Sequence, residues 1–153
     1  MLRRLTARGV DFVVIGGIAA ILHGSAQATY DLDICYATDE GNLKTLGEAL
    51  VDLGASVKGV TDQVPFVPDA QTLRRVELLT MDTPAGELDV LARPAGSRGY
   101  ETLRRNAERF DLGGFSVLVA SIDDLIAMKL AAGQHKDLAT VEELEAIKRL
   151  GKS

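Results

Sequence analysis

Two short stretches, Ile15-Gly16-Gly17 and Tyr30-Asp31-Leu32-Asp33-Ile34, carry the strongest structural signal in this sequence. The first ends an apolar run in two glycines, and the second alternates acidic with apolar residues. Side chains two positions apart in a β-strand share a face, so we expect Asp31 and Asp33 to converge while their neighbours turn into the core. Two close carboxylates repel each other unless a cation lies between them. The pair therefore predicts a site for a hard divalent ion bound by oxygen ligands.

Gly16 and Gly17 stand where a predicted strand over residues 11–15 meets a predicted short helix over residues 18–22. Glycines in such a turn let the backbone approach a ligand closely, and the free N–H groups of a helix start favour an anion such as a triphosphate. A tight turn that binds nothing uses the same residues, so this alternative stays open. The acidic pair that follows favours the phosphate interpretation.

A third acidic position, Asp89, lies in an otherwise apolar strand predicted over residues 87–92. Catalysts that hold two divalent ions about 4 Å apart need more oxygen ligands than two carboxylates supply. Glu87 is the alternative ligand, since residues 87 and 89 share one face of the strand and strand parity does not separate them. The apolar neighbours favour Asp89. An edge-strand acid that faces solvent is the structural alternative.

The composition is that of one globular domain. Of the 153 residues, 46% are hydrophobic and 25% are charged, close to the globular average. We expect a core over residues 1–120 and a helical extension packed on it over residues 121–153. The sequence has no apolar run long enough to span a membrane and no signal peptide, which predicts a cytoplasmic protein without a membrane partner. The single cysteine, Cys35, is expected to be a buried thiol.

The net charge of −5 argues against a protein that coats nucleic acid by electrostatics alone. Residues 93–109 nevertheless form a net positive stretch. It is interpreted either as a solvated helix face or as a surface for the phosphates of RNA or a nucleotide. Its arginines are Arg93, Arg98, Arg104, Arg105 and Arg109.

Hydrophobic periodicity and turn residues predict interleaved helices and strands. Further helices are expected over residues 2–8, 100–109 and 137–150, with two more that begin at the N-caps Thr38 and Ser121. Further strands are expected over residues 30–36, 56–60, 74–81 and 115–120, with a loop through Pro65 and Pro68 and a hairpin turn over residues 82–86. This order predicts an α+β fold: a mixed β-sheet layered with helices, and a helical C-terminal segment.

Together these residues resemble the nucleotidyltransferase superfamily of the DNA polymerase β type. Its pattern is a Gly-Gly or Gly-Ser turn, an Asp-x-Asp/Glu pair and a later Asp. The chain is most similar to the AbiEii-like branch, which acts as toxins in toxin–antitoxin systems. That similarity covers nearly the whole chain and rests on Ile15–Ala19, His23-Gly24, Thr29–Ile34, Asp124–Gly133 and Lys136–Leu138.

The resemblance implies an active site with two Mg²⁺ ions and an NTP substrate. Asp31, Asp33 and Asp89 would be the catalytic and metal-binding residues, with Asp89 beside the attacking oxygen of the acceptor. The implied nucleotide-binding residues are Gly16, Gly17, Thr29, Lys129, Lys136 and Asp137.

Two positions depart from the pattern of these relatives. Gln27 stands where they carry an arginine, which removes a candidate contact to the triphosphate. Thr140 stands where they tend to have a second acid. The first change predicts weaker activity or an altered substrate choice.

The resemblance therefore implies an enzyme that moves a nucleoside monophosphate from an NTP to an acceptor. The expected acceptor is RNA, in particular a tRNA 3′ end, and a protein hydroxyl ranks second. The expected biological role is that of a toxin with an antitoxin partner. A small-molecule acceptor is the alternative, although the chain is short for enzymes expected to add a larger acceptor-binding domain. A catalytically inactive nucleotide-binding module is the third hypothesis.

Overall fold

The computed structural model describes residues 1–58, 69–133 and 135–151, and in the last range the side chains from Leu138 onwards. Its strands are β1 (Phe12–Ile15), β2 (Asp31–Tyr36), β3 (Ser56–Val57), β4 (Leu78–Thr83), β5 (Gly86–Leu91), β6 (Glu108–Asp111) and β7 (Ser116–Val119). Its helices are α1 (Leu2–Ala7), α2 (Gly16–His23), α3 (Glu40–Asp52), α4 (Ala70–Arg75), α5 (Tyr100–Asn106), α6 (Ile122–Ala132) and α7 (His135–Gly151).

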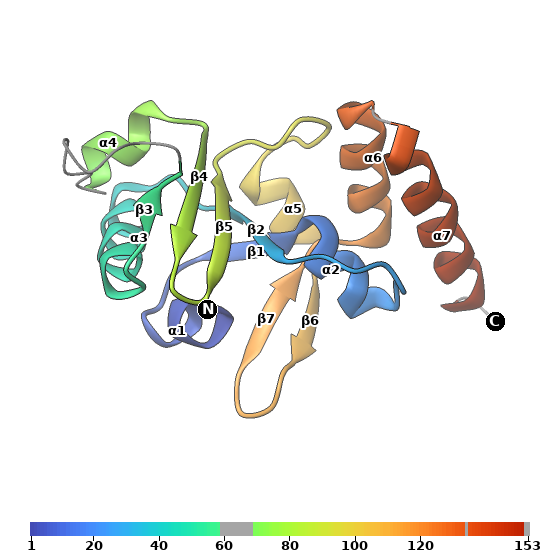
Figure 1. The fold of residues 1–153 in the computed structure, drawn as a ribbon, viewed down its shortest axis with the longest axis horizontal. Helices are drawn as coiled ribbons and strands as arrows, with labels where there is room; N and C mark the ends of the chain where they lie inside the picture. Colours follow the sequence, from blue (N-terminus) through green and yellow to red (C-terminus); the bar gives the residue numbers. More distant parts are fainter. Residues whose placement is uncertain (59–68, 134, 152–153) are drawn as a thin grey trace.

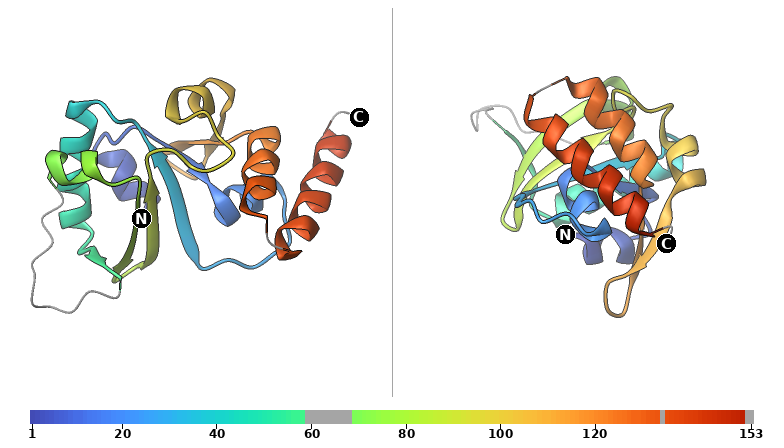
Figure 2. Two further views of the ribbon diagram at one scale, coloured as in Figure 1. Left: turned by 90° about the horizontal axis from the view of Figure 1, so that it is seen from above. Right: turned by 90° about the vertical axis from the view of Figure 1, so that its right-hand side faces the viewer.

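The described strands form one mixed sheet in the order β3-β4-β5-β2-β1-β7-β6. Strand β2 lies near its middle, antiparallel to β1 and parallel to β5. All four residues of β1 are buried, as the apolar run 12–15 predicts for a central strand. Helices α1, α3 and α4 gather at one end of the molecule, and α6 and α7 lie side by side at the other (Figures 1 and 2). The predicted α+β fold with a helical C-terminal segment is confirmed.

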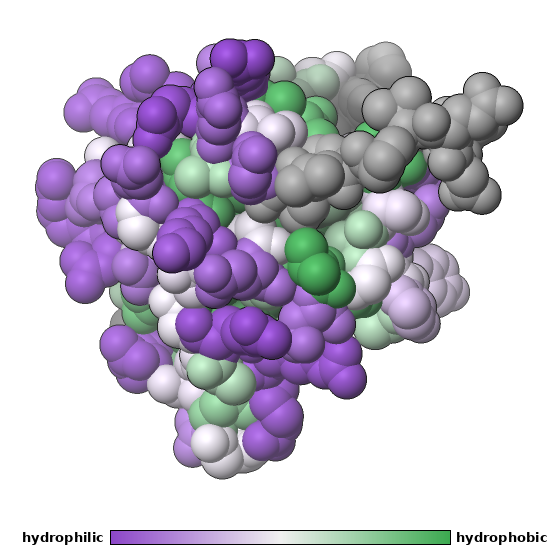
Figure 3. All heavy atoms as spheres, turned by 90° about the vertical axis from the view of Figure 1, so that its left-hand side faces the viewer, coloured by the Kyte–Doolittle hydropathy of each residue, from purple (hydrophilic) through white to green (hydrophobic). Residues whose placement is uncertain are grey.

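The face of the molecule over α3 and α4 is largely hydrophilic. Figure 3 shows its hydrophobic side chains scattered among polar ones rather than gathered into one patch. Val51 of α3 and Leu78 of β4 are two exposed hydrophobic residues in this part of the molecule. Isolated hydrophobic residues of this kind are usual on a soluble surface.

Several predicted boundaries are wrong, each for a local reason. The N-cap of α3 is Asp39 rather than Thr38, because the Asp39 carboxylate accepts a hydrogen bond from the backbone N–H of Asn42 at 3.0 Å. Residues 74–75 end helix α4 instead of beginning a strand. Asp69 caps α4 by accepting from the N–H of Thr72 at 2.7 Å. Part of the predicted strand 56–60 and the loop through Pro65 and Pro68 lie outside the described residues.

The predicted helix over residues 100–109 ends at Asn106, and β6 follows it. Strand β6 pairs antiparallel with β7. Its short length and exposed charged residues hide it from a periodicity search, since an edge strand of four residues has almost no apolar signal. In the described part of the chain, none of the helices combines the length and the apolar composition needed to cross a bilayer.

Candidate active site

The turn between β1 and α2 is built around two close approaches of side chains from the next strand. Gly16 has a φ of +70°, and a Cβ added there would lie 2.2 Å from Oδ2 of Asp33. A Cβ on Gly17 would lie 2.9 Å from Oγ1 of Thr29. Both glycines are thus required because the residues before and within β2 pack directly against the start of α2.

The sheet register brings four carboxylates onto one face. In the parallel β2–β5 pair, Asp31 lies opposite Glu87 and Asp33 lies opposite Asp89. The residue between the two aspartates, Leu32, is buried on the other face. The predicted convergence of Asp31 and Asp33 is confirmed, and Asp89 joins them because hydrogen-bonded neighbours in a sheet share a face.

The carboxylates carry the electrostatic signs of a cation site. Oδ1 of Asp33 is buried and has no hydrogen-bond partner among the described residues. Burial, followed by repulsion from Asp89, raises the pKa of Asp33 to about 7, and Lys129 acts in the opposite direction. Hydrogen bonding with Glu87, followed by burial, raises the pKa of Asp31. A carboxylate held this way is destabilised when ionised, and a bound cation relieves that cost.

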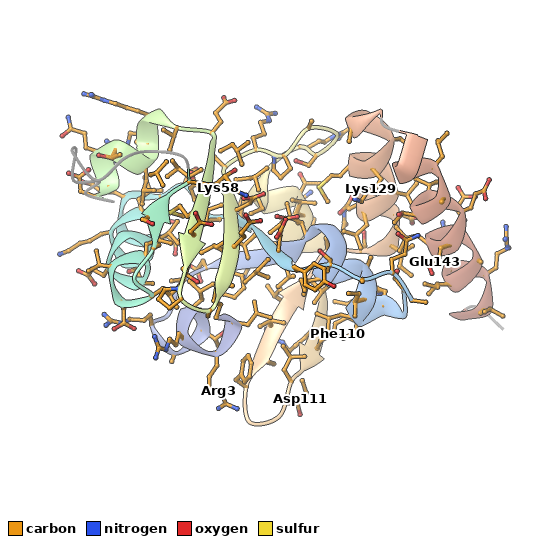
Figure 4. All side chains as sticks on the ribbon, in the orientation of Figure 1. Arg3, Lys58, Phe110, Asp111, Lys129 and Glu143 are labelled. Atoms are coloured by element: carbon orange, nitrogen blue, oxygen red, sulfur yellow. The ribbon has the colours of Figure 1, made fainter. Side chains whose placement is uncertain are left out.

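Two lysines flank the carboxylates from opposite sides, Lys58 just after β3 and Lys129 on α6 (Figure 4). Lys58 forms an ion pair with Glu87, which lowers the pKa of Glu87. Asp89 instead lines the same cavity as Asp31, Asp33 and Lys129. The structure therefore separates the two candidate acids of β5: the charge of Glu87 is compensated by a lysine, and Asp89 faces the cavity.

A divalent ion fits these carboxylates only as part of a larger complex. In the described residues, no three His, Cys, Asp or Glu side chains converge into a complete metal cage. Mg²⁺ is seldom held by protein alone, since it retains waters and binds one or two carboxylates together with substrate phosphates. The buried, unpartnered Oδ1 of Asp33 is the kind of oxygen such an ion would bind. The donor set fits Mg²⁺ when phosphates complete the coordination.

A polar cavity of about 360 Å³ lies over this face of the sheet. Six predicted residues line it: Gly17, Thr29, Asp31, Asp33, Asp89 and Lys129. Gly16 lines an adjoining cavity. Lys136 and Asp137 belong to the first turn of α7, but their side chains lie outside the described residues. Gln27 and Thr140, the two departures from the resemblance, also line the polar cavity.

The loop between α2 and β2, residues 24–30, forms one wall of this cavity and is held by α7. Glu143 accepts a hydrogen bond from Oγ of Ser25 at 2.5 Å and another from the N–H of Ala26 at 3.1 Å (Figure 4). Sequence reasoning missed this contact because the partners lie 118 positions apart. The only available signal was a serine near an expected phosphate turn, and that does not identify its partner.

The arginine-rich stretch lies away from the carboxylates. Arg93 and Arg98 line one separate cavity, and Arg104 and Arg109 line another. Lys129 is the only Lys or Arg among the described residues that line the polar cavity. This stretch therefore does not line the polar cavity, and its exposed arginines fit a solvated face and a surface for RNA phosphates equally well.

Comparison with known proteins finds similarity in structure only. No family model and no curated protein sequence matches the chain. The lincomycin-bound lincosamide antibiotic adenylyltransferase LnuA is 15% identical, with a TM-score of 0.64, over 95% of this chain and 92% of that chain. A putative nucleotidyltransferase from Thermotoga maritima is 16% identical, with a TM-score of 0.53, over 99% and 91%. ANT(2'')-Ia in complex with adenylyl-2''-tobramycin is 14% identical, with a TM-score of 0.56, over 97% and 91%.

At these identities the likeness establishes the fold, and it says nothing of the AbiEii-like branch. It also extends over nearly all of each chain, so it is not limited to the strands that carry the acids. The protein therefore has the fold of the nucleotidyltransferases.

Proposed function

We propose that this protein is a Mg²⁺-dependent nucleotidyltransferase that moves a nucleoside monophosphate from an NTP to an acceptor hydroxyl and releases pyrophosphate. The observation that carries this proposal is the group of Asp31, Asp33 and Asp89 on one sheet face, with Asp33 packed against the glycine turn that starts α2. The nucleotidyltransferase fold supports it independently. Carboxylates beside a helix start are the parts that in-line phosphoryl transfer requires.

Each residue has a role in this proposal. Asp31 and Asp33 would hold the metal with help from Asp89. When bound, Mg²⁺ neutralises the charge of the phosphates. Asp89 accepts the proton of the acceptor hydroxyl as its oxygen attacks the α-phosphorus. The bond from that phosphorus to the bridging oxygen of the β-phosphate breaks, and pyrophosphate leaves.

The rest of the polar cavity would bind the NTP. The N–H groups at the start of α2 and the hydroxyl of Thr29 face the phosphates, because both line the cavity beside the carboxylates. Lys129 supplies a positive charge at the same wall, and positioning together with charge neutralisation accounts for most of the catalysis in such reactions. Lys136 and Asp137, in the first turn of α7, are proposed as further nucleotide contacts.

The first acceptor that we propose, on the resemblance of the sequence, is an RNA hydroxyl at a tRNA 3′ end, with a toxin role and an antitoxin partner. A small-molecule hydroxyl is the second candidate, and a specific observation favours it. The chain covers 92% of LnuA, which acts on a lincosamide antibiotic. The expectation that such an enzyme needs a larger acceptor-binding domain is therefore wrong for LnuA, and chain length does not disfavour a small acceptor.

The test is transfer of α-³²P label from each NTP, with Mg²⁺, to total tRNA in one reaction and to a panel of small hydroxylated molecules in another. We expect label to move in one of them. The Asp31→Ala/Asp33→Ala protein should be inactive, while Asp111→Ala, an exposed aspartate of β6 at a distance from the cavity, should match the wild type. Equal transfer by the double variant would overturn the proposal. NTP binding without turnover in calorimetry would support an inactive module instead.

A further inference from the structure

A second, apolar cavity of about 240 Å³ adjoins the polar one. The two share Ala20, Asp33 and Lys129. Apart from Asp33 and Lys129, every described side chain that lines the second cavity is apolar or absent. These residues are Ile15, Gly16, Ala20, Leu91, Pro94, Ala95, Leu125, Met128, Ala132 and Leu144. No sequence pattern predicted this cavity, and the roles proposed above leave it without a function.

The cavity continues the face of the sheet that carries the acids. Leu91 follows Asp89 by two positions in β5 and shares its face, so the surface changes from acidic to apolar within one step along the strand. Helix α6 and the loop after β5 cover this part of the sheet. A Cβ on Gly96 would lie 2.5 Å from the carbonyl oxygen of Ala127, so only glycine lets this loop pack so closely on α6. The walls are thus fixed by tight packing.

We propose that this cavity binds the apolar body of the acceptor and presents its hydroxyl to the carboxylates. This inference rests on the proposed nucleotidyl transfer and selects its second acceptor candidate, a small molecule, over RNA. The acceptor class becomes a hydroxylated molecule with a compact, uncharged, largely apolar ring or chain. Phosphates and polycations are poor occupants, because burying a charge among apolar side chains is costly without a partner for each charge. A nucleobase would leave its polar edges unpaired there. The volume is below that of a site for a whole drug-sized molecule, so one ring or short chain is the expected fit.

The continuity of the two cavities places such an acceptor correctly for the reaction. A hydroxyl at the Asp33 end of the apolar cavity lies at the boundary of the polar cavity, where Asp89 and the α-phosphate would meet it. Its oxygen forms the bond to phosphorus, the bond to pyrophosphate breaks, and the proton passes to Asp89. The polar cavity remains available for the triphosphate, so the two substrates need not compete for space.

Met128 provides a direct readout, since it lines the apolar cavity while Met81 is fully buried in the core. The protein would be labelled with ¹³C at the methionine methyl groups and titrated with benzyl alcohol and cyclohexanol, with glycerol as the polar control. We expect a saturable shift of the Met128 methyl signal with the two apolar alcohols only, and an unchanged Met81 signal. With NTP and Mg²⁺ present, benzyl alcohol should stimulate pyrophosphate release and glycerol should not.

Two matched alanine variants test the location. Ala132 lines the cavity from an exposed position, so Ala132→Phe places a ring at the cavity mouth and should weaken alcohol binding about tenfold or more. Ala139→Phe makes the same change at an exposed position of α7 outside the cavity lining and should bind alcohol as the wild type does. Both variants should still bind NTP with Mg²⁺ in calorimetry, which also shows that they are folded.

The outcomes separate this inference from the proposed function. The acceptor role of the cavity would be overturned if the Met128 methyl signal did not shift with the alcohols, or shifted equally in Ala132→Phe. This holds even if nucleotidyl transfer to another acceptor is observed. A Met128 shift with NTP in place of alcohol would assign the cavity to the nucleotide and also overturn it. Alcohol binding by a protein that neither binds nor turns over NTP would overturn the proposed function, and the acceptor role with it.

Discussion

The β2–β5 strand pair and the α6–α7 helix pair contribute to the same site in different ways. The strand pair fixes Asp31, Asp33 and Asp89 through backbone register, so the position of each acid is set by many hydrogen bonds at once. The helix pair contributes through single side chains, Lys129 from α6 and Glu143 from α7. In the proposed function, the strands would determine whether the reaction is possible, and the helices would determine how substrates are held.

The largest effect is expected from the strand pair. Asp33→Asn keeps the shape of the side chain but removes a metal-binding charge, and we expect the transfer rate to fall by roughly 10³-fold or more. Label transfer at saturating NTP measures it. If Asp33→Asn keeps more activity than a change in the helix pair, the division of roles between the two regions is wrong.

Gly16→Ala tests the contact between Asp33 of the strand pair and the glycine turn between β1 and α2. The new Cβ would lie 2.2 Å from Oδ2 of Asp33, and a displacement of about 1 Å in such a site lowers activity by roughly 10²-fold. Gly133→Ala is the matched control: its φ of +68° is close to the +70° of Gly16, and no atom of the described residues lies within 4 Å of the added Cβ. Backbone strain alone should cost each variant about 1 to 2 kcal/mol of unfolding free energy, measured by denaturant titration. Gly16→Ala should lose more because of its clash with Asp33, and only Gly16→Ala should lose activity.

Glu143→Gln tests the helix pair. Glutamine offers one acceptor oxygen where the carboxylate offers two, so the hydrogen bonds from Ser25 and Ala26 can no longer both be kept. We expect the loop of residues 24–30 to loosen and the KM for NTP to rise by about fivefold to tenfold with little change in kcat. Glu142→Gln, at the exposed neighbouring position, should leave both constants unchanged. A fall in kcat alone would show that Glu143 acts on the reaction itself.

The smallest effect is a pH dependence of stability without metal. The folded pKa of Asp33, about 7, lies above the unfolded value of 3.8, so the native state binds the extra proton between these values. Stability should therefore fall as the pH rises through this window and level off above it. In EDTA at pH 8, the melting temperature of Asp33→Asn should exceed that of the wild type by roughly a few degrees. This difference should shrink towards pH 5. A pH-independent difference would contradict the buried, repelled state of this carboxylate.

Sequence spacing identified the parts of the site that depend on local periodicity. The shared face of Asp31 and Asp33 follows from strand alternation, and the choice of Asp89 follows from its apolar neighbours in sequence; neither inference needs knowledge of distant partners. The Lys58–Glu87 ion pair and the Ser25–Glu143 hydrogen bond join segments that are distant in sequence, so hydrophobic periodicity does not predict them. Helix α4 is a different case: its N-cap Asp69 is a local signal, but the helix has six residues and Leu73 is its one buried side chain, which is too little for a helical period.

Cys35 confirms the prediction of a buried thiol, and its position has a practical consequence. It stands two residues after Asp33 in β2, is fully buried, and its Sγ lies 3.6 Å from the carbonyl oxygen of Ala92. Burial raises the pKa of this thiol to about 12, so the folded protein offers almost no thiolate for alkylation at neutral pH. The chain has a single cysteine. The rate at which iodoacetamide alkylates it therefore measures how often the central sheet opens beside the carboxylates.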